Sequence, residues 1–150
     1  MVITSAQPRV CSVARTLEIV GEKWALLAVR EVFLGNRRFD EMVRRIGAPR
    51  DTLASRLRSL SSAGILERRQ YSEHPARFEY FLTEAGRDLY PVILTLMRWG
   101  DTYLNPGGDP PLVLEHECGE RLKAQVVCEA CGKPVTVGTA RPLHRDSTRI

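Results

Sequence analysis

Residues 37–83 read RRFDEMVRRIGAPRDTLASRLRSLSSAGILERRQYSEHPARFEYFLT, and this stretch decides the fold. From Phe39 to Ile46 the apolar residues recur at the i, i+3, i+4, i+7 spacing of one buried helix face, and Gly47 ends that pattern. Two runs rich in aromatic and β-branched residues follow, separated by a segment that contains Pro75. The stretch therefore predicts a helix over 38–46, a helix over 51–62, strands over 65–71 and 78–83, and a hairpin loop over 72–77.

The second predicted helix has two different faces. Leu53, Leu57 and Leu60 form one apolar stripe, and short polar side chains and an arginine occupy the opposite side. Such side chains hydrogen-bond base edges and phosphates when a helix lies in a major groove. The candidate DNA-binding residues are Arg50 directly before this helix, Asp51, Thr52, Ser55, Arg56, Arg58 and Ser59 in it, and Arg69 and Arg77 beside the hairpin loop. For Arg77 the alternative is a salt bridge that orients the wing.

Positive charge is concentrated in the same stretch. Residues 37–77 contain ten arginines and five acidic residues, a net of +5, whereas the whole chain has a formal charge of +4. The remainder is therefore nearly neutral, and the placement of the charge favours a nucleic-acid partner. Arginine outnumbers lysine by 19 to 3 along the whole chain, so the choice of arginine itself carries no such information.

Composition and motifs exclude several other classes of protein. With 150 residues, of which 43% are hydrophobic, the chain can bury an ordinary core without disulfides. Its apolar runs are far shorter than the roughly 20 residues of a membrane-spanning helix, and the N-terminus lacks the apolar run of a signal peptide. We find no phosphate-binding glycine loop, no Ser/His/Asp set and no paired carboxylates. We therefore expect a cytoplasmic, nucleoid-associated protein that is not an enzyme.

Helices are also predicted on both sides of the central stretch. Apolar periodicity indicates helices over 12–20 and 23–33, and Thr83 can cap a long helix from Glu84 to about Leu104. Pro91 lies inside that last pattern, which predicts either a kink or a separate short helix before it. The expected organisation is a mobile N-terminus (1–10), a winged helix-turn-helix domain (11–104), a linker (105–111), a small β-rich extension (112–140) and a flexible tail (141–150).

From Cys11 to about Leu104, the order and spacing of several motifs resemble the HxlR family of bacterial winged-helix transcriptional regulators, relatives of the MarR type. The residues that carry the resemblance are Cys11, Gly21-x-Lys23-Trp24, Gly35-x-x-Arg38-Phe39, Leu53-x-x-Arg56-Leu57-x-x-Leu60, Gly64-Ile65-Leu66, Pro75-x-Arg77-x-Glu79-Tyr80-x-Leu82-Thr83, Gly86-x-x-Leu89 and Trp99-Gly100.

The resemblance implies a homodimer that binds double-stranded DNA at a pseudo-palindromic operator, because two-fold protein symmetry matches two half-sites. In the family, the first helix and the long helix after the hairpin form the dimer contact. The positions in this sequence that correspond to the family's dimer contact are Leu17, Val20, Leu96, Met97 and Trp99. The alternative to a DNA-binding dimer is a winged-helix module for protein–protein interaction, with the extension as a second contact surface.

Some members of the family sense oxidants or electrophiles through a cysteine at the position of Cys11. A thiol beside a helix N-terminus can be reactive, because the helix dipole favours the thiolate. The resemblance thus implies a thiol-reactive or other small-molecule effector. The alternative is a small apolar residue that positions the first helix.

The extension contains the motifs His116-Glu117-Cys118-Gly119 and Cys128-Glu129-Ala130-Cys131-Gly132. Cys-x-x-Cys-Gly is a spacing at which one tight turn presents two thiolates, and His116 with Cys118 can complete a tetrahedral zinc site. His144 is a competing fourth ligand. The alternatives are a ribbon without metal and a Cys128–Cys131 redox pair, although a stable disulfide is disfavoured in the cytosol.

Overall fold

The computed structural model describes residues 11–105 and 107–143. The predicted mobile N-terminus and residues 144–150 of the predicted flexible tail lie outside the described residues. Two compact units make up the chain, of which the first ends at Tyr90 and the second begins at Pro91.

The first unit is mainly helical, with one two-stranded antiparallel sheet. This arrangement confirms the predicted winged helix-turn-helix. Two helices begin one residue away from the predicted position, at Phe39 and at Arg50, and end where predicted. Its elements are α1 (Ser12–Val20), α2 (Lys23–Phe33), α3 (Phe39–Ile46), α4 (Arg50–Ser62), β1 (Leu66–Glu73), β2 (Ala76–Leu82) and α5 (Glu84–Arg87).

The apolar faces of α3 and α4 form the core together with α2. Met42 and Leu57 are completely buried, and helix α2 contacts both α3 and α4. The predicted leucine stripe is confirmed, since Leu53 and Leu60 are at most 1% exposed. Burial of one such side chain stabilises the fold by about 1.5–3 kcal/mol. Gly47 ends α3 in the left-handed conformation, with φ of 70°, and its N–H donates to the carbonyl of Val43.

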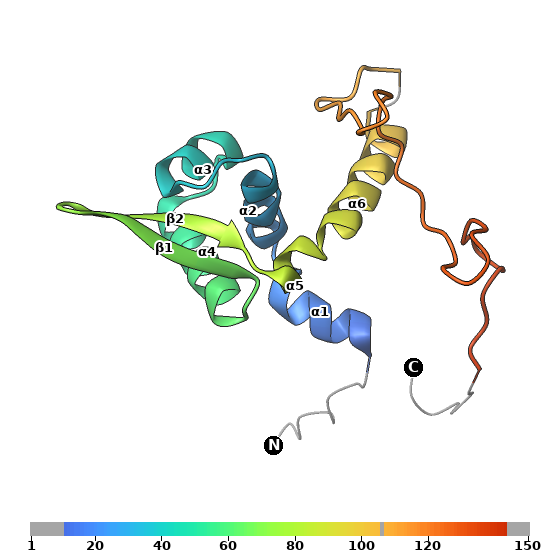
Figure 1. Ribbon diagram of the computed structural model, residues 1–150, viewed down its shortest axis with the longest axis horizontal. Coiled ribbons are helices and arrows are strands. Elements are labelled where there is room, and N and C mark those ends of the chain that lie inside the picture. The colour runs from blue at the N-terminus through green and yellow to red at the C-terminus, as the bar shows by residue number, and fades with distance from the viewer. Residues whose placement is uncertain (1–10, 106, 144–150) are drawn as a thin grey trace, which may run out of the picture. The chain divides into compact units, whose positions relative to one another are not determined.

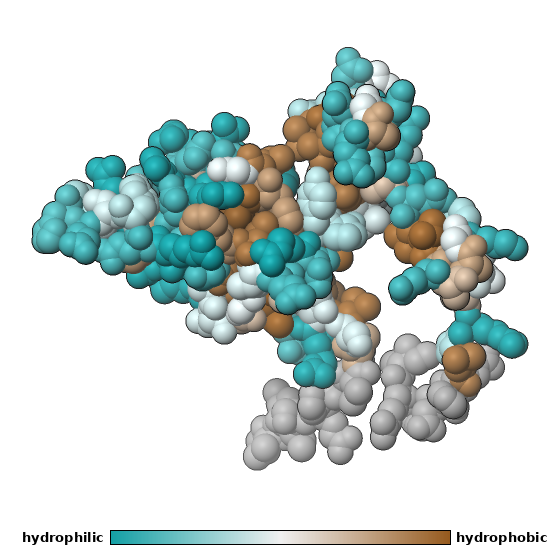
Figure 2. All heavy atoms as spheres, viewed as in Figure 1, coloured by the Kyte–Doolittle hydropathy of each residue, from teal (hydrophilic) through white to brown (hydrophobic). Residues whose placement is uncertain are grey.

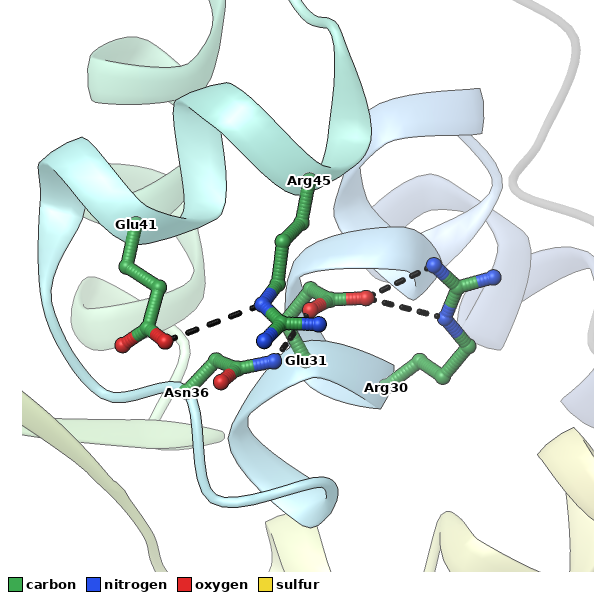
Figure 3. Close-up of polar contacts among 5 residues, drawn as sticks. All are labelled: Arg30, Glu31, Asn36, Glu41 and Arg45. Atoms are coloured by element: carbon green, nitrogen blue, oxygen red, sulfur yellow. Dashed lines mark hydrogen bonds and ion pairs between the residues drawn. The ribbon is translucent and has the colours of Figure 1, made fainter. Parts of the chain in front are cut away.

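A buried carboxylate holds the turn between α2 and α3 (Figure 3). Oε1 of Glu31 accepts from Nη2 and Nε of Arg30 at 2.7 and 3.3 Å. Its Oε2 accepts from Nδ2 of Asn36 at 2.6 Å. The backbone N–H of Asn36 also donates to the carbonyl of Glu31. The segment that leads into α3 is therefore tied to α2 by both main-chain and side-chain bonds.

The hairpin projects beyond the helices of the first unit (Figure 1), and its loop is shorter than predicted. Pairing continues to Glu73 and Ala76, so only His74 and Pro75 remain between the strands. The prediction of a six-residue loop was wrong because Pro75, which cannot donate in a ladder, occupies a turn position where no donor is needed. The His74–Pro75 peptide bond is cis. Before the hairpin, Arg38 forms an isolated antiparallel bridge with Glu79, which adds a third short segment at β2.

The region around Pro91 confirms the second of the two predicted alternatives. Helix α5 is a separate single turn, and α6 (Tyr90–Tyr103) begins one residue before the proline. Proline is tolerated there because the first turn of a helix has no internal partner for its N–H. The side chain of Thr83 caps α5 by accepting from the N–H of Gly86, as predicted.

The second unit consists of α6 and the described part of the extension. That part contains two isolated antiparallel bridges, Glu115 with Arg121 and Val127 with Pro134, and no regular strand between residues 107 and 143. A β-rich ribbon is therefore not shown. Among the helices that the structure describes, none has both the length and the apolar character required to cross a membrane.

Candidate nucleic-acid interface

Helix α4 presents a polar surface because its leucines face the core. Asp51, Arg58 and Ser59 are exposed, and Thr52 and Ser55 are partly exposed. Ser62, at the end of the helix, is exposed as well. The face predicted to contact DNA is thus accessible along the whole helix.

A groove of about 690 Å³ lies between this helix, α3 and the hairpin. Helix α4 contributes Arg58, helix α3 contributes Arg44, and the wing strands contribute Arg68 and Arg77. Arg38 lies at one side of the same groove. The hairpin end of this unit is covered mainly by hydrophilic side chains (Figure 2). We refer to Arg44, Arg58, Arg68 and Arg77 as the groove arginines.

The acidic residues near the groove are engaged in ion pairs. Asp40 pairs with Arg50 at 2.8 Å, and Glu41 pairs with Arg45 at 3.6 Å. Within residues 11–105 and 107–143, no carboxylate partner is found for any of the four groove arginines. The groove therefore has an excess of positive charge, which attracts a polyanion such as a nucleic-acid backbone.

Aromatic rings support several arginines of the wing. The guanidinium of Arg68 lies 3.8 Å from the ring centroid of Phe78. Arg38 lies over Tyr71 at 4.6 Å and donates to the Glu79 carboxylate at 2.9 Å. A guanidinium that stacks on a ring keeps its N–H donors at the edge free for other acceptors. The wing thus presents preoriented donors and not freely rotating side chains.

Three of the predicted DNA-binding arginines have other neighbours. Arg50 pairs with Asp40, and Arg69 forms two hydrogen bonds, of 2.9 and 3.0 Å, to the Glu67 carboxylate. The Arg69 guanidinium holds the pKa of Glu67 below its ordinary value by hydrogen bonding to the carboxylate. Arg56 lies 3.8 Å from the carboxylate of Glu22, the residue that precedes α2. Of the predicted DNA-binding residues, Arg58 and Arg77 are the ones that line the groove.

The prediction from sequence did not include Arg38, Arg44 and Arg68. The sequence feature that points to these three residues is the high density of arginine in residues 37–77, but that density does not show which of the arginine side chains lie together. The convergence depends on how the hairpin lies against α3 and α4, and that is a tertiary property. Because successive side chains of a strand point to opposite faces, Arg68 and Gln70 share one face of β1, but the sequence does not show that this face borders the groove.

The residues predicted for dimer contact differ in exposure. Val20 is 3% exposed and belongs to the core of the first unit. Leu17 is 55% exposed on α1, and Leu96 and Trp99 are 52% and 57% exposed on α6. Met97, also on α6, is partly exposed. Apolar surface thus remains open on both helices.

Cys11 is exposed and directly precedes α1. Its carbonyl accepts the first hydrogen bond of the helix, from the N–H of Arg15. No side-chain hydrogen bond caps the helix at this position. In the single chain, the Cys11 thiol is therefore accessible to solvent.

In the extension, the four predicted metal ligands form two separate pairs. Nδ1 of His116 lies 3.3 Å from Sγ of Cys118. The backbone N–H groups of Ala130 and Cys131 and the side chain of Cys131 lower the pKa of the Cys128 thiol by hydrogen bonding to its sulfur. No group of three or more potential metal ligands comes together among the described residues.

Comparison with known families identifies this architecture. The model of the HxlR-like helix-turn-helix family matches residues 19–107, which is more than half of the chain. The chain belongs to the HxlR-like helix-turn-helix family. The match includes α2 to α6 and every residue of the groove, so the family predicted from sequence is confirmed. An HxlR-like protein of this kind is a DNA-binding transcriptional regulator of the winged-helix type.

Several HxlR-like relatives are named as transcriptional regulators. The HTH-type transcriptional regulator Rv3095 of Mycobacterium tuberculosis is 49% identical over 132 residues, which cover 87% of this chain and 84% of that protein. The HTH-type regulator sll1512 of Synechocystis is 35% identical over 96 residues, which cover 63% of this chain and 71% of that protein. An alignment over 87% of the chain must continue past α6 into the extension, wherever it begins.

Solved structures of winged-helix regulators resemble the HxlR-like chain as well. PA1607, described as a candidate transcription factor, has a TM-score of 0.79 at 32% identity and covers 95% of this chain and all of that chain. The reduced form of the transcriptional regulator YodB from Bacillus subtilis has a TM-score of 0.53 at 30% identity, over 65% of this chain and 98% of that chain. The redox regulator HypR in its reduced form has a TM-score of 0.56 at 33% identity, and the match covers 63% of this chain and 95% of that chain.

Proposed function

We propose that this HxlR-like regulator binds a pseudo-palindromic operator as a homodimer. In each subunit, α4 enters a major groove and the wing follows the adjacent sugar–phosphate backbone. The observation that carries the proposal is the groove between α4, α3 and the hairpin, with four arginines that have no carboxylate partner among the described residues. Phosphate contacts from arginine fix the position of the helix, and side chains of α4 read base edges.

Roles within this surface follow from the side-chain positions. Arg58 is exposed on α4 and is the residue of the helix best placed to contact a guanine edge or a phosphate. Thr52, Ser55 and Ser59 offer short hydroxyl groups on the same helix. Arg56 is assigned a structural role in this proposal, because its guanidinium lies beside Glu22.

Exposed apolar side chains on α1 and α6 support the homodimer. Helix α1 exposes Val13 and Ile19 in addition to Leu17, and α6 exposes Leu96 and Trp99. Several exposed apolar side chains on one helix favour an interaction site on that helix, because leaving them in water is costly. Since Val20 is buried in the first unit, it is not part of the proposed interface.

We also propose that an oxidant or electrophile regulates DNA binding through Cys11. The thiol is exposed at the start of α1, where a modification alters the end of a helix in the proposed dimer contact. Two structural neighbours at 30% and 33% identity, YodB and HypR, were solved in forms named as reduced, and HypR is named as a redox regulator. These names support the proposal and do not define the oxidant.

Selection from a random duplex library tests the proposed function. The purified full-length protein is incubated with the library at physiological salt, and bound duplexes are sequenced over several rounds. Enrichment of an inverted repeat with half-sites about one helical turn apart, or a multiple of that distance, is the expected result. If the chain is instead a protein-interaction module, no duplex sequence should be enriched, and its binding to a protein partner should not weaken steeply as the salt concentration rises.

A further inference from the structure

The extension contains two tight turns, each closed by a hydrogen bond from a glycine N–H. In the first, the N–H of Gly119 donates to the carbonyl of His116 at 2.9 Å, and in the second, the N–H of Gly132 donates to the carbonyl of Cys128 at 2.7 Å. Both glycines have positive φ, 83° and 69°, a conformation that other residues rarely adopt. Each glycine directly follows a cysteine. The second turn is one residue longer than the first, and each turn contains a thiol directly before its glycine.

Each turn also places two metal-binding side chains next to each other. His116 and Cys118 lie within 3.3 Å of each other at the first turn. At the second turn, the N–H groups of Cys131 and Gly132 donate to the carbonyl of Cys128 at 3.3 and 2.7 Å, which places both cysteines in one tight turn. All four side chains are exposed and can be reached from solvent. Each pair supplies two of the four donors of a tetrahedral zinc site, and the two turns must approach each other to complete it.

The donor set has the chemistry of a structural zinc site. Three thiolates and one imidazole satisfy four-coordinate tetrahedral zinc, and thiolates select zinc over magnesium or calcium. The extension otherwise lacks a means of stabilisation, because it has two isolated bridges and exposed valines such as Val126, Val127 and Val137. Small segments without a sufficient core are commonly held together by a metal.

We propose that the extension binds one zinc ion per chain through His116, Cys118, Cys128 and Cys131. Because each turn supplies two ligands, zinc binding joins the turns into a single small fold. Nine residues separate Cys118 from Cys128, and a loop of this length costs little entropy to close. Between the turns, the carbonyl of Ala124 accepts from Nη1 of Arg98 at 2.6 Å, which ties the middle of this loop to α6 within the second unit. The four proposed ligands belong to the second unit and include none of the groove arginines, so this proposal does not depend on the proposed operator mode.

Metal content of the reduced full-length protein tests the proposal. The protein is produced with zinc in the medium, separated from free metal, and assayed by mass spectrometry of the elements. We expect one zinc per chain in the wild type and in Cys11→Ser, which removes the one cysteine outside the extension. Cys118→Ser and Cys131→Ser are expected to lose bound zinc, and their thermal unfolding shows whether the first unit remains folded.

Histidine variants test the fourth ligand. His116→Ala is expected to lose zinc to a chelator faster than the wild type, and His144→Ala, at a position outside the described residues, is expected to retain it. Zinc that survives in both cysteine variants contradicts the site, as does a wild-type chain that binds no zinc when the metal is added to the reduced protein. A Cys128–Cys131 disulfide in freshly purified, zinc-treated protein likewise overturns the proposal in favour of a redox pair.

Discussion

The buried carboxylate at the start of the helix-turn-helix offers a sharp test of how the fold is stabilised. Nδ2 of Asn36 donates to Oε2 of Glu31 at 2.6 Å, and the two residues are 7% and 2% exposed. Asn36→Ala leaves that carboxylate oxygen buried without this donor. Because hydrogen bonds to charged groups contribute about 1.5–3 kcal/mol, we expect the free energy of unfolding to fall by about 2–3 kcal/mol.

The ion pair between Arg45 and Glu41, which lies near Glu31 and Asn36 (Figure 3), provides a control for the loss of an exposed polar contact. Arg45 and Glu41 are 3.6 Å apart on α3, with side chains 57% and 34% exposed. Such an exposed i, i+4 pair contributes about 0.3–0.5 kcal/mol. We therefore expect Arg45→Ala to lower the free energy of unfolding by less than a quarter of the Asn36→Ala effect.

Urea unfolding followed by circular dichroism measures these differences. All variants are compared at one protein concentration, because the apparent stability of the proposed dimer would depend on concentration. The double variant Glu31→Leu/Asn36→Ala completes a cycle. Removing the carboxylate as well as its donor should cost less than the sum of the two single changes, by about 1 kcal/mol or more. The reasoning is refuted if Asn36→Ala costs no more than Arg45→Ala, or if the two changes are strictly additive.

Three further predictions concern the core, the turn after the wing and the thiol. Leu57→Ala, at a completely buried position, should destabilise the protein by about 3 kcal/mol in urea unfolding, and a loss below about 1 kcal/mol contradicts the assigned core. Gly86→Ala should lower the free energy of unfolding by about 1–3 kcal/mol, because a Cβ at this position would lie 2.2 Å from the carbonyl oxygen of Ile65. Gly100→Ala serves as the control, because a Cβ there meets open space, and it should leave the melting temperature unchanged or raise it. Cys11→Ser should abolish diamide-induced release from DNA, and a retained response excludes Cys11 as the sensor.

Local signals were sufficient to predict the helices. The apolar periodicity of α3 and α4 follows from residues three and four apart on one face, so the buried leucines of α4 could be identified without a structure. Pro91 predicted a break, and the capping threonine at position 83 marked where the next helix begins. The loop of the hairpin was overestimated, because a proline in sequence does not show how close to the turn the ladder continues.

Side-chain partners across elements could not be predicted in the same way. Arg56 lies on the helix predicted to contact DNA, yet its nearest carboxylate belongs to Glu22, 34 residues earlier. Conversely, Arg44 and Arg68 come from different elements and line one groove with Arg58. Such juxtapositions depend on tertiary packing, which composition and spacing do not determine. The pairing of His116 with Cys118 was predictable, because two positions so close in sequence meet in one turn.

The affinity of the protein for its selected duplex, measured by fluorescence anisotropy over a range of salt concentrations, tests the central claim most directly. Arg58→Ala should weaken binding by about 1–3 kcal/mol, or about 5- to 150-fold, if Arg58 reads a base. If it contacts phosphate alone, the loss is smaller and the slope of affinity against salt becomes shallower. Arg141→Ala removes the same charge from the predicted tail, which is not part of the groove, and should bind as the wild type does. Unchanged affinity and salt slope for Arg58→Ala, or equal losses in both variants, contradict the assignment of α4 and its groove as the DNA-binding surface.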